Sequence, residues 1–154
     1  MRRRAAERTV SVLAAAFLVA FFVQAAVRSA GAVADGGANE ESGLFAEAQC
    51  DRVSGPGKVH CSVLERPIMG KLSWGDVIVL SAPPFAPPLR TRIAAGDATR
   101  RDESGAEFAL ALAATGDGSG ELRVLARAVV CSERGCRPVR AEAKARVVVG
   151  TETP

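Results

Sequence analysis

The chain has 154 residues and a formal net charge of +3, with 24% charged and 48% hydrophobic residues. The positive excess lies in the first 34 residues, which hold five Arg and one Glu, whereas the remaining residues carry 15 basic and 16 acidic side chains. The folded part therefore lacks the domain-wide positive field that attracts nucleic acid, and we expect no nucleic-acid partner.

Residues 1–34 have the features of a signal peptide. The start is basic, Val10–Val23 is almost wholly apolar, and Ala32-Val33-Ala34 is an A-x-A cleavage site. An uncleaved anchor helix over residues 10–27 is the alternative, because this run is just long enough to span a bilayer. The positive flank stays in the cytoplasm in both cases. We therefore expect a periplasmic or secreted protein, or one anchored to the inner membrane by residues 10–27.

Residues 35–43 are a polar, glycine-rich linker, residues 44–150 are long enough for one domain, and residues 151–154 form a tail. Within the domain, apolar and polar residues alternate between glycine-rich turns. This pattern predicts an all-β, immunoglobulin-like two-sheet antiparallel sandwich of about seven strands. The expected strands are Phe45–Val53, Lys58–Leu64, Lys71–Leu80, Leu89–Ile93, Phe108–Leu112, Glu121–Val130 and Val139–Val149.

Three stretches of the domain allow more specific expectations. The run Val77–Leu80 is apolar on both faces, which predicts a central strand covered on both sides. Residues 81–88 contain four prolines, which cannot lie inside a sheet, so we expect an extended edge or a crossover loop. Residues 94–105 are charged and rich in turn residues, and we expect a loop there.

Four cysteines in a small exported domain predict two disulfides, for which three pairings exist. A Cys50–Cys61 bridge between the first two strands would place both sulfurs on the core face, and would stabilise the fold by roughly 2–3 kcal/mol as a structural bond. The two pairings that would tie the first hairpin to the last remain open.

A Cys131–Cys136 bridge has the opposite orientation. In the hairpin register that pairs these cysteines, the apolar residues of the last two strands share one face, and the sulfurs point away from it or lie in the loop. The same register places Arg127 opposite Arg140, a mildly unfavourable pair of like charges that a local bulge could relieve.

An exposed disulfide at a hairpin tip has two interpretations. It can exchange with partner thiols, and the neighbouring Arg134 and Arg137 would favour the reactive thiolate of Cys131 or Cys136. It can equally be a staple, because small exported domains use disulfides mainly as scaffolding.

The segment Cys131-Ser-Glu-Arg-Gly-Cys136-Arg-Pro138, between a strand and the alternating Val139–Val149, resembles the end of the periplasmic N-terminal domain of DsbD. That family of thiol:disulfide interchange proteins, or disulfide bond correctors, has an immunoglobulin-like sandwich with two redox cysteines on a late hairpin. The resemblance covers about the last thirty residues of the domain. It departs from the family in having Val139 after Pro138, where a second proline is common, and in the Cys50/Cys61 pair.

The resemblance implies roles for individual residues. Cys136 would engage partner proteins and Cys131 would be the resolving cysteine. Phe85, on the proline-rich segment, would be a candidate cap that shields the cysteines, although a Phe that anchors this segment to the core is the simpler interpretation. The implied partners are periplasmic thiol/disulfide proteins, either thioredoxin-like or membrane electron-transfer proteins.

Other residues carry weaker signals. His60 is the only histidine, and the cysteine spacing lacks the close pairs of common zinc modules, so we expect no metal and no cofactor. Trp74, the only tryptophan, is expected in the core. The two hypotheses of function are therefore a thiol-disulfide exchange module acting through Cys131/Cys136, and a non-enzymatic, disulfide-stapled binding or structural module.

Overall fold

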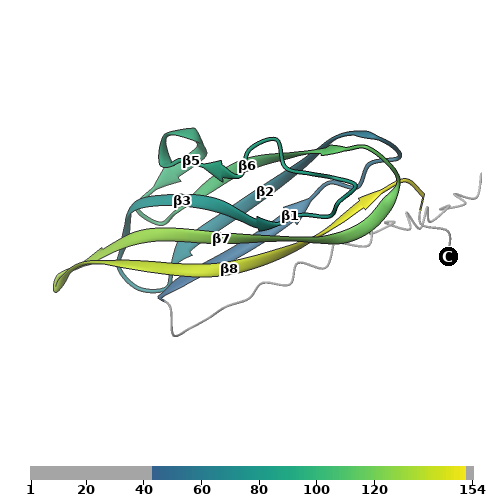
Figure 1. Ribbon diagram of the computed structural model, residues 1–154. Helices are drawn as coiled ribbons and strands as arrows, with labels where there is room; N and C mark the ends of the chain where they lie inside the picture. The colour runs from purple at the N-terminus through teal and green to yellow at the C-terminus, as the bar shows by residue number, and fades with distance from the viewer. Residues whose placement is uncertain (1–42, 152–154) are drawn as a thin grey trace, which may run out of the picture.

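The computed structural model of the protein describes residues 43–151 (Figure 1). The expected signal or anchor helix, most of the linker and the end of the tail lie outside the described residues. Within residues 43–151, no helix is long and apolar enough to cross a membrane.

The described residues form two antiparallel four-stranded sheets packed face to face, so the predicted all-β sandwich is confirmed (Figure 1). The first sheet has the order β1-β2-β6-β5 and the second the order β4-β3-β7-β8. The strands are β1 (Leu44–Cys50), β2 (Gly57–Pro67), β3 (Lys71–Ser81), β4 (Arg92–Ile93), β5 (Ala98–Asp102), β6 (Gly105–Ala114), β7 (Gly118–Ser132) and β8 (Gly135–Val149).

The core lies between the sheets and is made of residues that alternate along the strands. In β7, for example, Leu122, Val124 and Ala126 are fully buried, whereas the residues between them are half-buried. A strand directs successive side chains to opposite faces, so this alternation fixes which face of each strand packs inward. Phe108 of β6 is the largest side chain that is completely enclosed.

The structure has eight strands in residues 43–151, one more than expected, because the charged segment 94–105 contains the edge strand β5. Its residues from Thr99 to Asp102 are all exposed, and an edge strand tolerates charges that a central strand would not. The strand expected at Leu89–Ile93 is reduced to the two residues of β4.

The proline-rich segment, residues 81–88, runs along the edge of the first sheet. An extended edge was one of the two arrangements expected for it. The backbone amide of Leu89 donates to the carbonyl of Ala111, at 2.9 Å, and that of Thr115 donates to Phe85, at 2.8 Å. These bonds satisfy the end of β6, which β5 is too short to reach. The segment connects β3 to β4 in the second sheet, and so it joins both layers.

Strand β3 lies between β4 and β7, which confirms that it is central, but it is not covered on both sides. Ile78 and Val79 are only half-buried and Leu80 is 44% exposed. The outer face of the second sheet is open among the described residues, and Ile78 and Leu80 lie on that side, whereas Val77 and Val79 face the core.

One ionisable side chain, that of Glu65 in β2, lies inside the sandwich. It is fully buried, and neither carboxylate oxygen has a hydrogen-bond partner in the described part of the chain. It packs on Gly75 of β3, where a Cβ atom would overlap Glu65 Oε1. Burial, and to a lesser extent the charge of Asp76, raise the pKa of Glu65 to about 8, although Arg101 acts in the opposite direction. Glu65 is therefore an uncharged carboxylic acid at neutral pH.

This buried acid predicts that stability falls as the pH rises. Between the ordinary pKa of 4.5 and the raised value of about 8, the unfolded chain releases the Glu65 proton while the folded chain keeps it. The free energy of unfolding should therefore decrease across this window by about 5 kcal/mol, and level off above it. Urea unfolding at a series of pH values would measure this decrease.

The neutral variant Glu65→Gln is the control for this prediction. Its unfolding free energy should lack the decrease between pH 5 and 8, because Gln cannot ionise. Parallel pH profiles for the two proteins would show that Glu65 is already charged in the folded state.

Candidate functional site

The candidate site is the tip of the β7–β8 hairpin, which extends past the other strands (Figure 1). Cys131 and Cys136 face each other in the ladder, with Cα atoms 3.9 Å apart, and are joined by a disulfide. The ladder continues one pair further, to Ser132 and Gly135, so the turn has only two residues. Gly135 has a φ of +118°, a conformation that favours glycine.

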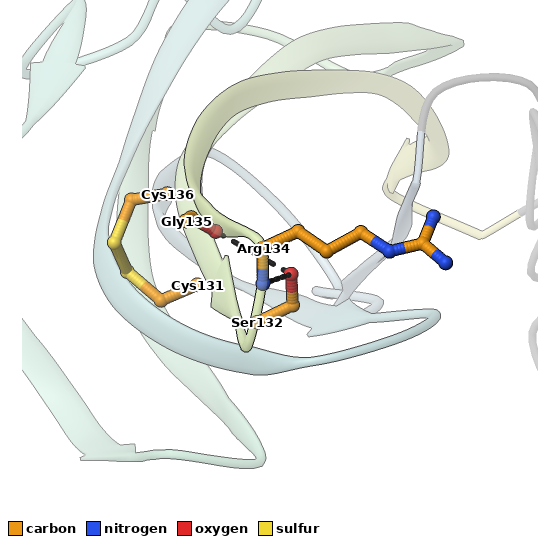
Figure 2. Close-up of a disulfide and its surroundings, with 5 residues drawn as sticks. All are labelled: Cys131, Ser132, Arg134, Gly135 and Cys136. Carbon is orange, nitrogen blue, oxygen red and sulfur yellow. Dashed lines mark hydrogen bonds between the residues drawn. A yellow bond between two sulfur atoms is a disulfide. The ribbon is translucent and has the colours of Figure 1, made fainter.

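Ser132 closes the turn (Figure 2). Its hydroxyl accepts a hydrogen bond from the backbone amide of Arg134, at 3.3 Å, and donates to the carbonyl of Gly135, at 3.4 Å. A serine hydroxyl that bonds to nearby backbone groups is typical of tight turns. The strands on either side therefore hold the two cysteines at fixed positions.

The structure contains the two disulfides that each join cysteines within one hairpin. The β7–β8 ladder pairs Cys131 with Cys136 and Arg127 with Arg140, as expected. The other disulfide joins Cys50 to Cys61 across β1 and β2, and these residues are only 8% and 5% exposed. Cys136 is exposed and Cys131 half-buried. The two bonds therefore differ in access, as the alternation of side chains predicted.

The two arginines expected beside the sulfurs do not lie there. Figure 2 shows the Arg134 side chain extending away from the disulfide. Arg137 follows Cys136 in β8 and points to the opposite face, where its guanidinium packs over Gly43. Adjacent residues of a strand lie on opposite faces. An arginine that is next to a cysteine in the sequence therefore need not lie near its sulfur.

Phe85 does not cap the cysteines either. It packs against Gly118 and Gly120, at the start of β7, and it contacts the core. Cys131 lies eleven residues further along β7 than Gly120, which separates the two places by roughly 35 Å. Phe85 anchors the proline-rich segment, which was the simpler of the two interpretations.

The like-charged pair Arg127 and Arg140 is balanced from a third strand. Asp76 of β3 lies opposite Arg127 and is fully buried. Arg127 Nε donates to Asp76 Oδ1 at 2.8 Å, and Arg92 Nε donates to Asp76 Oδ2 at 2.7 Å. The hydrogen bond to the Asp76 carboxylate raises the pKa of Arg127. The β7–β8 ladder therefore remains unbroken, and no bulge is needed at this pair.

Trp74 lies on the outer face of the second sheet, so its expected place in the core is wrong. It is half-buried and pairs with Val129, which in turn faces Pro138. These side chains line a hollow of about 420 Å³ that is bordered by Arg127 and Arg140. A bulge between Leu72 and Trp74 turns Trp74 to this face. No sequence pattern predicts the bulge or the register of β3 against β7.

The turn between β2 and β3 lies beside the hairpin tip. Gly70 adopts a φ of +90°, and a Cβ there would approach the Cys131 carbonyl oxygen to 2.6 Å. Met69, which is 77% exposed, lines a second hollow with Cys136 and Arg137. Sequence reasoning missed Met69, since it lies between two strands and follows no alternation.

Within residues 43–151, no group of three or more His, Cys, Asp or Glu side chains is placed to hold a metal. His60 is exposed on β2, and its backbone carbonyl accepts a hydrogen bond from the amide of Asp51. Its side chain is thus remote from the hairpin tip, at the other end of β2 from the turn that contains Gly70.

Comparisons of the chain with known protein families, with curated proteins and with solved structures find no match.

The two disulfides should contribute differently to stability. Replacing Cys131 and Cys136 together by Ser should lower the unfolding free energy by about 2 kcal/mol and leave the sandwich folded, because this bond closes a short exposed loop. Replacing Cys50 and Cys61 together by Ala should lower it by about 3 kcal/mol or more, since buried contacts are lost as well. Urea unfolding of the two variants measures the difference, and a larger loss from the tip would contradict it.

Proposed function

We propose that this protein is an exported thiol-disulfide exchange module, with an immunoglobulin-like sandwich, that acts on periplasmic partner proteins through Cys131 and Cys136. The main support is the contrast between the two disulfides: Cys136 is exposed at a hairpin tip, whereas Cys50 and Cys61 are buried. Exchange needs a partner sulfur to approach along the disulfide axis, so it requires exposure of at least one sulfur. The resemblance of Cys131–Pro138 to the DsbD hairpin also supports the proposal.

The positions of the cysteines in the sheet support separate roles. Cys136 lies on β8, an edge strand, and Cys131 lies on β7, between β8 and β3. Lys71 of β3 lies beside Cys131 in the ladder, and Gly70 approaches its carbonyl. A partner therefore reaches Cys136 more easily, which fits Cys136 as the sulfur that joins the partner and Cys131 as the one that resolves the mixed disulfide.

In the reducing direction, the Cys136 thiolate attacks a partner disulfide, forms a mixed disulfide and releases one partner sulfur as a thiolate. The Cys131 thiolate then attacks Cys136 Sγ, which re-forms the Cys131–Cys136 bond and releases the second partner thiolate. The partner gains two electrons and the module loses two. A thioredoxin-like or membrane electron-transfer protein would restore the dithiol by the reverse steps.

A second candidate function is a non-enzymatic binding or structural module in which both disulfides are staples. The observation that favours it is the position of Cys131 and Cys136 in an unbroken ladder, where the bond joins two strands that are already paired. In this case the tip disulfide would hold the hairpin together beyond the end of the sandwich.

A redox titration separates the two candidates. The exported protein is equilibrated in buffers of increasing dithiothreitol, the free thiols are alkylated, and mass spectrometry identifies which cysteines are modified. Exchange predicts that Cys131 and Cys136 become alkylated under much milder reduction than Cys50 and Cys61, without unfolding. The buried pair is the internal control.

The contrary result is equally clear. If Cys131 and Cys136 are reduced only together with Cys50 and Cys61, or only when the sandwich unfolds, the bond is a staple and the exchange proposal fails.

A further inference from the structure

The surface next to the tip disulfide combines apolar side chains with arginine side chains around one hollow. In the β7–β8 ladder, Cys131–Cys136 is followed by Val129–Pro138 and then by Arg127–Arg140 on the same face, at steps of about 7 Å. Trp74 lies beside Val129 on β3. The hollow described above therefore begins one pair away from the disulfide, on the face to which its sulfurs point.

The hollow is separated from the next apolar pair on this face, Ile78 and Leu125, by the charged row of Asp76, Arg127 and Arg140. Further along β7 and β8, most of the outward residues are charged, and they form ion pairs such as Arg123–Glu142, at 2.7 Å, and Lys144–Glu121, at 3.4 Å. Trp74 and Val129, by contrast, are half-buried and Pro138 is exposed. An apolar hollow of about 420 Å³ within a charged surface is a feature of binding sites.

The border of the hollow carries unbalanced positive charge. Asp76 is the carboxylate that approaches it, and both Arg127 and Arg92 share this one group. Arg140, which is exposed, has no carboxylate partner among residues 43–151. Arg127 and Arg140 border the hollow, and the one carboxylate beside them is shared between Arg127 and Arg92, so a carboxylate on a partner would complement Arg140.

We propose that this hollow docks a segment of the thiol partner in which an apolar side chain is flanked by acidic residues. The apolar side chain would pack on Trp74, Val129 and Pro138, and a carboxylate would bind Arg140. The docked segment would lie one residue pair from the disulfide, which would bring the partner sulfur within reach of Cys136. This inference rests on the proposed exchange at Cys131/Cys136.

Trp74 makes the docking directly measurable, because it is the only tryptophan of the chain and lies in the hollow. The oxidised full-length protein is titrated with a synthetic peptide that contains one Phe between acidic residues and no cysteine, while the emission of Trp74 is recorded. A matched peptide with Lys in place of each acidic residue is the comparison. We expect at least tenfold tighter binding of the acidic peptide, with a shift in the emission spectrum.

Two protein variants locate the binding. Arg140→Glu should abolish or reverse the tenfold preference, because it removes the unpaired guanidinium. Arg146→Glu makes the same change of charge on the same strand and face, but further from the tip, and it should leave the preference intact. Equal effects of the two substitutions, or no preference in the unaltered protein, would overturn the proposal.

The peptides lack cysteine, so this result does not depend on the redox titration. Selective binding without mild reduction of Cys131–Cys136 would refute the exchange and with it a thiol partner for this hollow. Mild reduction without selective binding would leave the exchange standing and refute the docking. A change in Trp74 emission with protein concentration alone would assign the hollow to a second copy of the chain, and would also overturn the proposal.

Discussion

The register of the β7–β8 ladder is the constraint on which the candidate site depends. Because side chains alternate along a strand, the register that turns Leu122, Val124 and Ala126 into the core necessarily turns Cys131 outward. A shift of one residue would bury the sulfurs and expose the apolar set, at the loss of the inter-sheet core. The hydrophobic core and the accessibility of the disulfide are thus set by the same ladder.

Two buried carboxyl groups, on either side of β3, illustrate how position decides charge. Asp76 points to the outer face, where the long side chains of Arg92 and Arg127 reach it and form ion pairs with it. Glu65 points between the sheets, where Gly75 leaves room for it but no cation or hydrogen-bond donor of the described residues satisfies its oxygens, and its pKa is raised. Asp76 binds Arg127 at the border of the hollow, and Glu65 makes the stability of the core depend on pH.

The sequence predicted the features that depend on neighbouring strands. Alternation within β1–β2 and β7–β8 predicted the opposite orientations of the two hairpin disulfides and the facing pair Arg127–Arg140, because hairpin registers are local, but it left the other disulfide pairings open. It did not predict how β3 pairs with β7, since that pairing joins distant segments and includes a bulge before Trp74. This non-local register places Trp74 outside and brings Asp76 to Arg127, so the hollow beside the disulfide could not be found from the sequence. The simpler interpretation of Phe85, an anchor that holds the proline-rich segment on the core, agrees with the structure.

Cys131 and Cys136 are paired in the β7–β8 ladder, and this pairing has a consequence for a reduced form of the protein. The strand pairing from Gly118–Val149 up to Val130–Arg137 does not require the disulfide, and it would hold the two cysteines opposite each other after reduction. Each thiol would then face the other at a high effective concentration, so that closing the bond again would be an intramolecular step with little loss of chain entropy. The backbone of the tip would be nearly the same in both redox forms, and repeated cycles would require no refolding of the sandwich.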